Sequence, residues 1–286
     1  MLKGLVFTLN TLGLKVTVRE VLRRTLGLKY QYKGIPIDSH SSFRFIRNMI
    51  WKDYDLYGLD GEIVVRTPFG EVGVEASDYG LLYVLLEPLI EMYGNINVDN
   101  AVVVDVGAFL GETALLFVKR GAKRVYAFEP VKTFYDYLVK NIAKNSAEDK
   151  IIPFNCGIWF RNTVLNVTLL GTGTGLKVNA NHPSVELDVR DLKDVLTMIH
   201  DKEGVIDLVK MDCEGCEYSL LQLDEEHIKL SKQYIMEIHG CETPLIDKML
   251  QAGYNSKLIL KLNEWVKIYL LPDLPINPPP FPHDLC

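Results

Sequence analysis

Short apolar runs alternate with stretches of helical period along most of the chain beyond residue 100. The apolar runs have the length of buried strands, and they occupy residues 102–104, 125–128, 151–155, 205–211 and 233–238. Apolar residues at helical spacing separate them, at residues 131–146, 191–200, 219–223 and 242–252. Strands that alternate with helices in this way predict a mostly parallel sheet with helices packed on its faces.

The predicted sheet ends in an antiparallel pair, residues 257–262 and 265–271, which turns at residues 263–264. With the five earlier strands, this pair predicts an α/β fold with a seven-stranded, mostly parallel, Rossmann-like sheet. Residues 158–169 alternate enough to add one or two antiparallel strands. The glycine run at 171–175 is interpreted as a hairpin tip or lid, because neither a helix nor a Lys-Ser/Thr pair follows it as in a phosphate loop.

The first part of the chain predicts helices and a hairpin rather than further parallel strands. Its elements are a helix from a capping box at Thr17 and Glu20 to Gly27, a helix from Ser41 or Ser42, a hairpin of 62–65 with 71–74, and a helix over 78–93. We therefore expect an N-terminal extension (1–95) that caps an acceptor site or forms an oligomer contact, an α/β domain (96–271) and a proline-rich tail (272–286).

Composition is ordinary for a soluble globular protein, since 48% of the 286 residues are hydrophobic and 24% are charged. The net charge of −6 is uneven, because the stretch from Arg19 to Lys52 carries +6 and the remainder carries −12. A solvated helix face explains this basic stretch better than an anionic partner, so no strong nucleic-acid signal is present. The uncharged run at residues 4–14 is too short to cross a bilayer, and no membrane span is expected.

Five cysteines occur at scattered positions, namely Cys156, Cys213, Cys216, Cys241 and Cys286. Their odd number argues against a disulfide framework and favours a reducing, cytoplasmic location. Cys213 and Cys216 form a single C-x-x-C motif without a second pair. Two small side chains packed in a tight turn are favoured there over a zinc or redox site.

The densest chemical signal is the segment AVVVDVGAFLGETALLFVKRGAKRVYAFEP, residues 101–130. A strand ends at Asp105, Gly107 and Gly111 bracket a tight turn, and the next strand ends at Glu129. This pattern is typical of a nucleoside-binding βαβ unit, in which a terminal carboxylate can accept two hydrogen bonds from a ribose diol. The spacing is D-x-G-x-x-x-G and not G-x-G-x-x-G. It therefore favours S-adenosylmethionine over a dinucleotide, whose pyrophosphate needs the latter turn.

A second group of chemically active residues follows the fourth and fifth predicted strands. Asp212, Glu214 and Glu217 lie within one turn, and His239 ends the fifth strand. Ligands bind at this edge of open α/β sheets, and methylation of a hydroxyl needs a base, so Asp212, Glu214 and His239 are the predicted catalytic residues. The structural alternative is that Asp212 and Glu217 cap the following helix. No metal site is predicted, although these side chains could converge, because methyl displacement onto a hydroxyl does not require one.

The motifs DVGAFLGET, YAFEP and KMDCEGCEYSLL together resemble the FkbM family of S-adenosylmethionine-dependent methyltransferases. The resemblance covers about residues 101–239 and implies a class I methyltransferase fold that methylates a hydroxyl of a sugar or small metabolite by direct displacement. The predicted cofactor residues are Asp105, Gly107, Ala108, Phe109, Gly111, Glu112, Thr113, Glu129, Pro130, Asn155, Cys156 and Asp212. Phe109 stands where the family usually has Asn, so a polar contact there is absent or falls to Glu112 or Thr113.

Three other functions stay open on sequence grounds. A nicotinamide oxidoreductase would need the missing G-x-G-x-x-G turn. A nucleic-acid methyltransferase has only the basic stretch from Arg19 to Lys52 in its favour. A non-catalytic protein could retain the nucleoside-binding fold. The expected partners are S-adenosylmethionine and a small-molecule or glycan hydroxyl acceptor, and a homo-oligomer is an open alternative.

Overall fold

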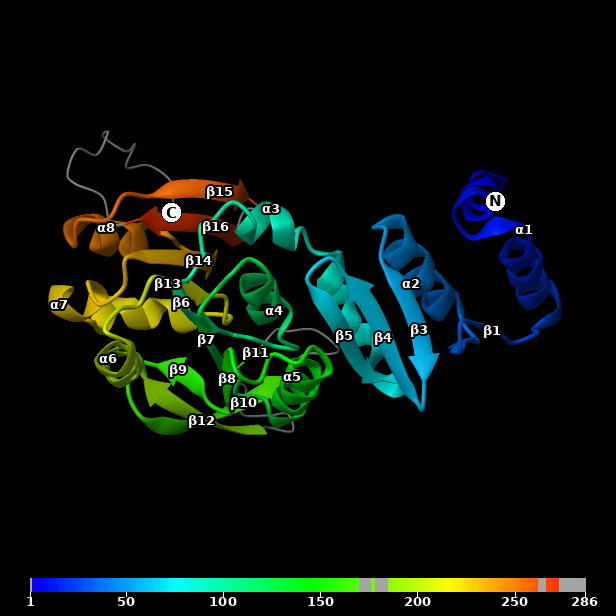
Figure 1. Ribbon diagram of the computed structural model, residues 1–286. Coiled ribbons are helices and arrows are strands. Elements are labelled where there is room, and N and C mark those ends of the chain that lie inside the picture. The colour runs from blue at the N-terminus through cyan, green and yellow to red at the C-terminus, as the bar shows by residue number, and fades with distance from the viewer. Residues whose placement is uncertain (1, 170–175, 178–184, 262–265, 273–286) are drawn as a thin grey trace. The chain divides into compact units, whose positions relative to one another are not determined.

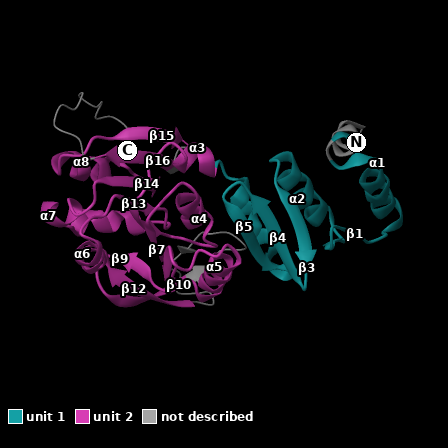
Figure 2. Cartoon of the chain, viewed as in Figure 1, with its two compact units in different colours: residues 1–88 teal, residues 89–286 magenta. Residues whose placement is uncertain are grey.

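The computed structural model describes residues 2–169, 176–177, 185–261 and 266–272 (Figure 1). The glycine run at 171–175, the predicted turn at 263–264 and the tail beyond Pro272 lie outside these residues. The chain divides into two compact units, Met1–Pro88 and Leu89–Cys286 (Figure 2). No helix among the described residues combines the length and the apolar character that a bilayer crossing requires.

The first unit contains a three-stranded antiparallel sheet with a helix packed on it. Its elements are α1 (Leu2–Leu26), β1 (Tyr30–Tyr32), β2 (Ile35–Ile37), α2 (His40–Trp51), β3 (Asp55–Leu59), β4 (Glu62–Thr67), β5 (Gly70–Glu75) and a 3₁₀ helix, η1 (Ala76–Leu86). The predicted hairpin is confirmed, because β4 and β5 pair with Val65 opposite Val72. The predicted second helix is α2, in which Phe43 and Ile46 are fully buried and Ser39 is the N-cap.

The start of the first helix differs from the prediction, whereas its end does not. The predicted start at Thr17 is wrong, because α1 begins at Leu2 and is interrupted at Gly13, where φ is 80°. The Thr17 hydroxyl donates to the Gly13 carbonyl over 2.9 Å, and Glu20 pairs with two arginines of the same helix instead of capping it. The predicted end is confirmed, since the Gly27 N–H donates to the Arg23 carbonyl over 2.9 Å.

A single helix over 78–93 is also wrong. The chain instead forms η1 and then the short α3 (Leu89–Tyr93), with Glu87 in an extended conformation (ψ 154°). Proline disfavours helical backbone in the residue before it, so Pro88 accounts for the break between the two helices.

The second unit contains the predicted seven-stranded sheet, in the order β15-β16-β14-β13-β6-β7-β8 (Figure 1). The strands are β6 (Val102–Val106), β7 (Arg124–Phe128), β8 (Ile151–Phe154), β13 (Leu208–Met211), β14 (Gln233–His239), β15 (Lys257–Lys261) and β16 (Val266–Pro272). The strand β16 is antiparallel to both of its neighbours, β14 and β15, and the other adjacent strands of this sheet are parallel. The helices are α4 (Glu112–Lys119), α5 (Lys132–Lys144), α6 (Leu192–Glu203), α7 (Glu225–Ile228), α8 (Thr243–Gln251) and a 3₁₀ helix, η2 (Cys216–Gln222). The fold class is thereby confirmed.

A second sheet of four strands, in the order β11-β10-β12-β9, was not predicted as such. It comprises β9 (Gly157–Trp159), β10 (Thr163–Leu169), β11 (Leu176–Lys177) and β12 (Val185–Asp191). The strand β10 is antiparallel to β12, as expected for this region, whereas β9 pairs with β12 in parallel. Its core packs Val131 with Val167, Leu187 and Val189.

The strand order places one edge of the large sheet in a position to bind a ligand. The strand β6 lies between β7 and β13 and is parallel to both. Later strands are added on one side of β6 as far as β8 and then on its other side from β13, so the strand order reverses at β6. In open α/β sheets the crevice at such a reversal, outside the carboxyl ends of the strands, is where ligands bind. The carboxyl ends of β6, β7, β13 and β14 carry the residues that sequence analysis selected.

Candidate active site

The turn after β6 is tightly folded and pressed against the loop that follows β13. The N–H groups of Gly107 and Ala108 both donate to the Phe128 carbonyl, each over 3.0 Å. The φ angles of Gly107 and Gly111 are 80° and 92°, in the left-handed region. A Cβ atom on Gly107 would lie 1.8 Å from the carbonyl oxygen of Asp212. Only glycine therefore fits this position, and the spacing D-x-G reflects contact between two loops.

We expect Gly107→Ala to destabilise the fold more than a matched change at Gly204. Both glycines have a φ close to 80°, so alanine at either costs about 1–2 kcal/mol for the left-handed backbone. A Cβ at Gly204 meets nothing within 4 Å, whereas at Gly107 it collides with backbone. Urea unfolding of the two variants measures the difference. Equal losses of stability would show that the two loops are not in this contact.

Asp105 forms a buried polar cluster next to the turn. Its Oδ2 accepts a hydrogen bond from the Thr113 hydroxyl over 2.6 Å, and its Oδ1 lies 3.0 Å from the Lys210 Nζ. The Lys210 ammonium also donates to the Gly107 carbonyl over 2.8 Å. The side chains of Asp105 and Lys210 are 0% and 2% exposed. The cluster therefore ties β6, α4 and β13 together behind the turn.

Sequence analysis assigned no role to Lys210. Burial alone would lower the pKa of this lysine, but the carboxylates of Asp105, Asp212 and Glu112 raise it well above its usual range. The ammonium is thus charged and neutralises part of the acidic edge of the sheet. The sequence did offer a sign of this ion pair, because Lys210 lies inside the apolar run 205–211. Lysine is almost never fully buried unless it is paired with an acid.

Glu129 lies at the end of β7 with its carboxylate turned toward the glycine turn. Its Oε2 accepts the Phe109 N–H over 3.0 Å, and its Oε1 accepts the Val131 N–H over 2.7 Å. Burial raises the pKa of Glu129 to about 8, although these two hydrogen bonds oppose the shift. The Asn155 amide donates to the carbonyls of Glu129 and Pro130 over 3.0 and 3.1 Å, which holds the Glu-Pro segment in place.

The remaining residues of the predicted cofactor set surround the turn. Phe109 is a non-glycine residue with φ of 46°, a conformation that Asn adopts more readily than Phe. Its ring packs edge-on against Phe134 with centroids 4.7 Å apart. Glu112 begins α4 and is buried, as is the free thiol of Cys156, whose pKa is raised by burial. The Thr113 hydroxyl is engaged with Asp105, as described above.

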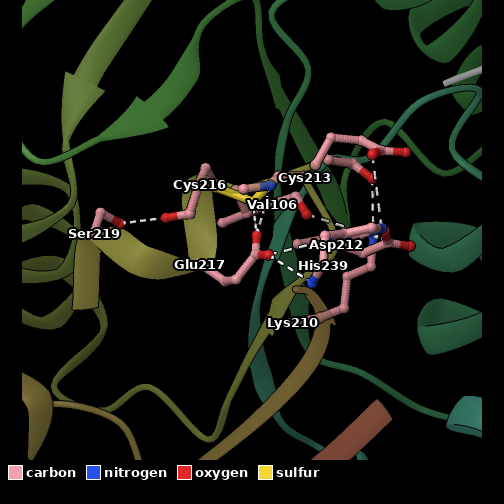
Figure 3. Close-up of a disulfide and its surroundings, with 12 residues drawn as sticks. Val106, Lys210, Asp212, Cys213, Cys216, Glu217, Ser219 and His239 are labelled. Carbon is pink, nitrogen blue, oxygen red and sulfur yellow. Dashed lines mark hydrogen bonds and ion pairs between the residues drawn. A yellow bond between two sulfur atoms is a disulfide. The ribbon is translucent and has the colours of Figure 1, made fainter. Parts of the chain in front are cut away.

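The acidic loop after β13 contains a feature that contradicts the sequence prediction. Cys213 and Cys216 are joined by a disulfide (Figure 3). The expectation of two separate small side chains in a tight turn, without a disulfide, is therefore wrong. Gly215, with φ of 113°, and Glu214, with φ of 57°, form the turn that brings the two sulfurs together. Spacing alone does not predict such backbone angles.

Glu217 connects this loop to the end of β14 (Figure 3). Its side chain is completely buried, its Oε2 accepts the Gly215 N–H over 2.9 Å, and its Oε1 accepts the His239 N–H over 2.9 Å. The same Oε1 lies 3.5 Å from Nδ1 of the His239 ring. The structural alternative for Glu217 is thus partly correct, because it bonds a backbone N–H at the start of η2 as well as His239.

The His239 ring is surrounded by carboxylates. Its Nε2 lies 3.5 Å from Glu237 Oε1 and 3.8 Å from Glu214 Oε2. Burial would lower the pKa of His239, but the neighbouring carboxylates of Glu217, Glu237 and Glu214 raise it to about 11. Burial also raises the pKa of Glu237. Sequence analysis missed Glu237, although an acid two residues before His239 in an apolar strand must share its face.

The three predicted catalytic residues are brought to one place. Glu214 Oε2 lies 3.8 Å from His239 Nε2, and a carboxylate oxygen of Asp212 lies within 4.8 Å of a ring nitrogen of His239. Glu237, which was not predicted, lies within the same 4.8 Å of both Asp212 and His239. Asp212 is also approached by the Tyr93 hydroxyl, at 3.5 Å from Oδ2. The cofactor candidates lie around the ends of β6 and β7, and the catalytic candidates lie around the ends of β13 and β14. The two groups are neighbours because β13 pairs with β6. This edge can hold a nucleoside beside an acidic group that removes a proton.

The strand order, the glycine turn after β6 and the acid at the end of β7 define the Rossmann-like class of fold that class I methyltransferases use. The sequence profile of the methyltransferase FkbM domain matches residues 105–256, and the chain belongs to this family. The resemblance inferred from the three motifs is confirmed.

Known proteins of this kind share moderate similarity with the chain. Methyltransferase sdnD of Sordaria araneosa is 28% identical over 172 residues, which cover 49% of this chain and 66% of that protein. The structure of methyltransferase FkbM from Methylobacillus flagellatus KT is 20% identical, with a TM-score of 0.47, over 68% of this chain and 53% of that one. A Pyrococcus horikoshii protein described as a transferase is 15% identical, with a TM-score of 0.47, over 90% and 97%. The chain thus spans under two thirds of sdnD and about half of the Methylobacillus protein.

Proposed function

We propose that the chain is an S-adenosylmethionine-dependent methyltransferase that transfers the methyl group to a hydroxyl oxygen of a sugar or small metabolite. The observation that carries the proposal is the juxtaposition of two groups at one sheet edge. Glu129 and the glycine turn lie at the ends of β6 and β7, and Asp212, Glu214 and His239 lie at the ends of the adjoining β13 and β14. A methyl donor and a proton acceptor are both required for this reaction.

Glu129 is suited to bind the ribose of the cofactor. A carboxylate has about four acceptor positions, two on each oxygen. Each oxygen of Glu129 accepts one backbone N–H, from Phe109 or from Val131. One position per oxygen is then left for the two hydroxyls of a ribose. The backbone bonds also orient the carboxylate, so that little freedom is lost when the ribose binds.

The reaction would be a direct displacement, with the acceptor oxygen, methyl carbon and sulfonium sulfur in line. Alignment of two bound reactants can supply at most about 7–11 kcal/mol of the barrier. The role of the chain is therefore to hold the cofactor at the turn and the acceptor beside Asp212. The hydroxyl proton would pass to the carboxylate of Asp212 or Glu214, since the raised pKa of His239 keeps its ring protonated. The sulfonium would leave as a neutral thioether.

The pH dependence of cofactor binding tests the proposal. Ribose hydroxyls donate to the ionised carboxylate, and the pKa of Glu129 in the folded chain is about 8. The affinity for S-adenosylhomocysteine is therefore expected to rise by up to about tenfold per pH unit and to level off above about pH 8. Calorimetric titration between pH 6 and 9 measures it, while the formation of S-adenosylhomocysteine with hydroxylated acceptors reports turnover.

Glu129→Gln is the matched control, because it keeps the shape of the side chain and removes the titration. We expect weaker binding with no rise between pH 6 and 8. Stability must be followed in parallel. The folded pKa of Glu129 lies above its ordinary value of 4.5, so the free chain loses stability as the pH rises from about 4.5 to 8. If wild-type protein binds no S-adenosylhomocysteine at any pH, the proposed function is wrong.

A further inference from the structure

The ends of β13 and β14 contain a donor set for a metal ion. Asp212 and Glu237 each offer a carboxylate oxygen and His239 offers a ring nitrogen, and these atoms all lie within 4.8 Å of one another. A single divalent cation binds such donors at about 2.0–2.3 Å, so donors on opposite sides of it are about 4–4.6 Å apart. Small rotations of side chains would therefore place all three around one ion.

Regular strands fix the positions of these donors. Glu237 and His239 are two residues apart in β14, so their side chains lie on the same face of the strand. Asp212 directly follows β13, which pairs in parallel with β14 and sets Met211 opposite Met236. A site built on adjacent strands is held more precisely than one built on loops.

The orientation of His239 is a second observation that points to a metal. Glu217, which is completely buried, lies 3.5 Å from the Nδ1 side of the ring, so Nε2 faces Glu237 at 3.5 Å. Metal-binding histidines almost always donate their other ring N–H to a carboxylate or carbonyl, which fixes the ring. Glu217 is itself held by the N–H groups of Gly215 and His239, at 2.9 Å each. Glu217 therefore holds the ring with Nε2 turned toward Glu237, the orientation that a metal ligand needs.

We propose that Asp212, Glu237 and His239 bind a divalent cation of the Mn²⁺ type, oriented by Glu217, and that the acceptor coordinates this cation through a pair of neighbouring hydroxyls. Carboxylates suit Mg²⁺ and Mn²⁺ and imidazole suits later transition metals, so Mn²⁺ accommodates this mixed set. Three protein donors leave coordination positions for two acceptor oxygens. The inference rests on the proposed function only for the acceptor, because the metal site stands on its own geometry.

The cation would assist proton removal from the acceptor. Coordination to a metal lowers the pKa of a bound hydroxyl, so its proton can pass to a carboxylate such as Glu214, which lies 3.8 Å from His239 Nε2. The resulting alkoxide oxygen forms a bond to the methyl carbon as the carbon–sulfur bond breaks, and the sulfonium becomes a neutral thioether. No electron acceptor or further reactant is needed.

Binding of Mn²⁺ to the full chain in the absence of cofactor tests the site. Electron paramagnetic resonance titration should show one Mn²⁺ per chain. Glu237→Gln, which removes a ligand, should weaken binding by at least about 100-fold, and Glu217→Gln by about 10–100-fold, as for lost supporting groups. Glu225→Gln, an exposed acid of α7 paired with Lys229, should leave binding unchanged. Thermal melting identifies any variant that fails to fold. If Glu237→Gln does not fold, His239→Gln, which also removes a proposed ligand, is used in its place.

The proposed metal site and the proposed function fail in distinguishable ways. If Mn²⁺ does not bind, or binds equally to the wild type, Glu237→Gln and His239→Gln, the metal site is wrong. S-adenosylhomocysteine binding and methyl transfer in excess EDTA would then still support the function. If Mn²⁺ binds as expected but no S-adenosylhomocysteine does, the metal site stands and the methyltransferase assignment is wrong.

Discussion

Lys210→Met is expected to lower the free energy of unfolding by about 3–5 kcal/mol. Removing one partner of a buried ion pair leaves the other charge uncompensated, and the penalty is of this size. The carboxylate left behind is Asp105, whose side chain is 0% exposed and lies 3.0 Å from the lysine. The Gly107 carbonyl loses a hydrogen bond at the same time. Urea denaturation at neutral pH measures the change.

An exposed lysine of the same unit provides the control. Lys232 pairs with Asp207 over 2.7 Å, but its side chain is 62% exposed. Surface pairs contribute about 0–1 kcal/mol, so Lys232→Met should change stability little. Adding Asp105→Asn to Lys210→Met removes the stranded charge and should restore part of the loss. If Lys210→Met costs no more than Lys232→Met, the buried pair does not stabilise the fold.

Asp212→Asn is expected to lower turnover by about 10²–10⁴-fold while S-adenosylhomocysteine still binds. Removing a group that takes the proton in the transition state typically costs this much, and loss of a metal ligand at the reacting oxygen would act in the same direction. The side chain is 28% exposed, and its neighbours are Lys210 at 3.8 Å and the Tyr93 hydroxyl at 3.5 Å. Initial rates at saturating cofactor measure the loss, and calorimetry measures cofactor binding.

Asp136→Asn is a suitable comparison for this experiment. Asp136 is 50% exposed on α5 and pairs with Lys132 on the same helix. Its substitution should leave both the rate and cofactor binding unchanged. Full turnover in Asp212→Asn would exclude Asp212 as the base and as a required ligand. If turnover is lost instead, titration of Asp212→Asn with Mn²⁺ shows whether Asp212 acts as a metal ligand or only as the base.

Local patterns predicted most of the large sheet. Each run of buried apolar residues became a strand, because a parallel strand covered on both faces is apolar almost throughout. The four-stranded sheet escaped prediction although β12 alternates, with Leu187 and Val189 buried and Glu186 and Asp188 exposed. The alternation of β12 could be recognised as that of a strand, but the pairing of β9 with β12 joins residues about 30 positions apart. No local rule specifies that pairing.

The candidate site was predicted in its parts but not in its connections. The turn motif indicated Asp105 and Glu129, since both follow from spacing within one βαβ unit. Lys210 is more than 100 residues from Asp105, and their ion pair depends on the register in which Lys210 lies beside Asp105 in the sheet. The Cys213–Cys216 disulfide depends on the backbone angles of the turn. The sequence therefore indicated residues that the fold brings to one edge of the sheet, but it could not predict which of them would touch.

The position of Glu217 has a consequence for how relatives of this protein diverge. This carboxylate is completely buried, and it accepts hydrogen bonds both from the loop after β13 and from the last residue of β14. Exchange of rim side chains can alter acceptor preference while these two strand ends keep their spacing. A change at position 217 would instead disturb every acceptor alike. We expect family members with different substrates to vary around this residue and to retain it.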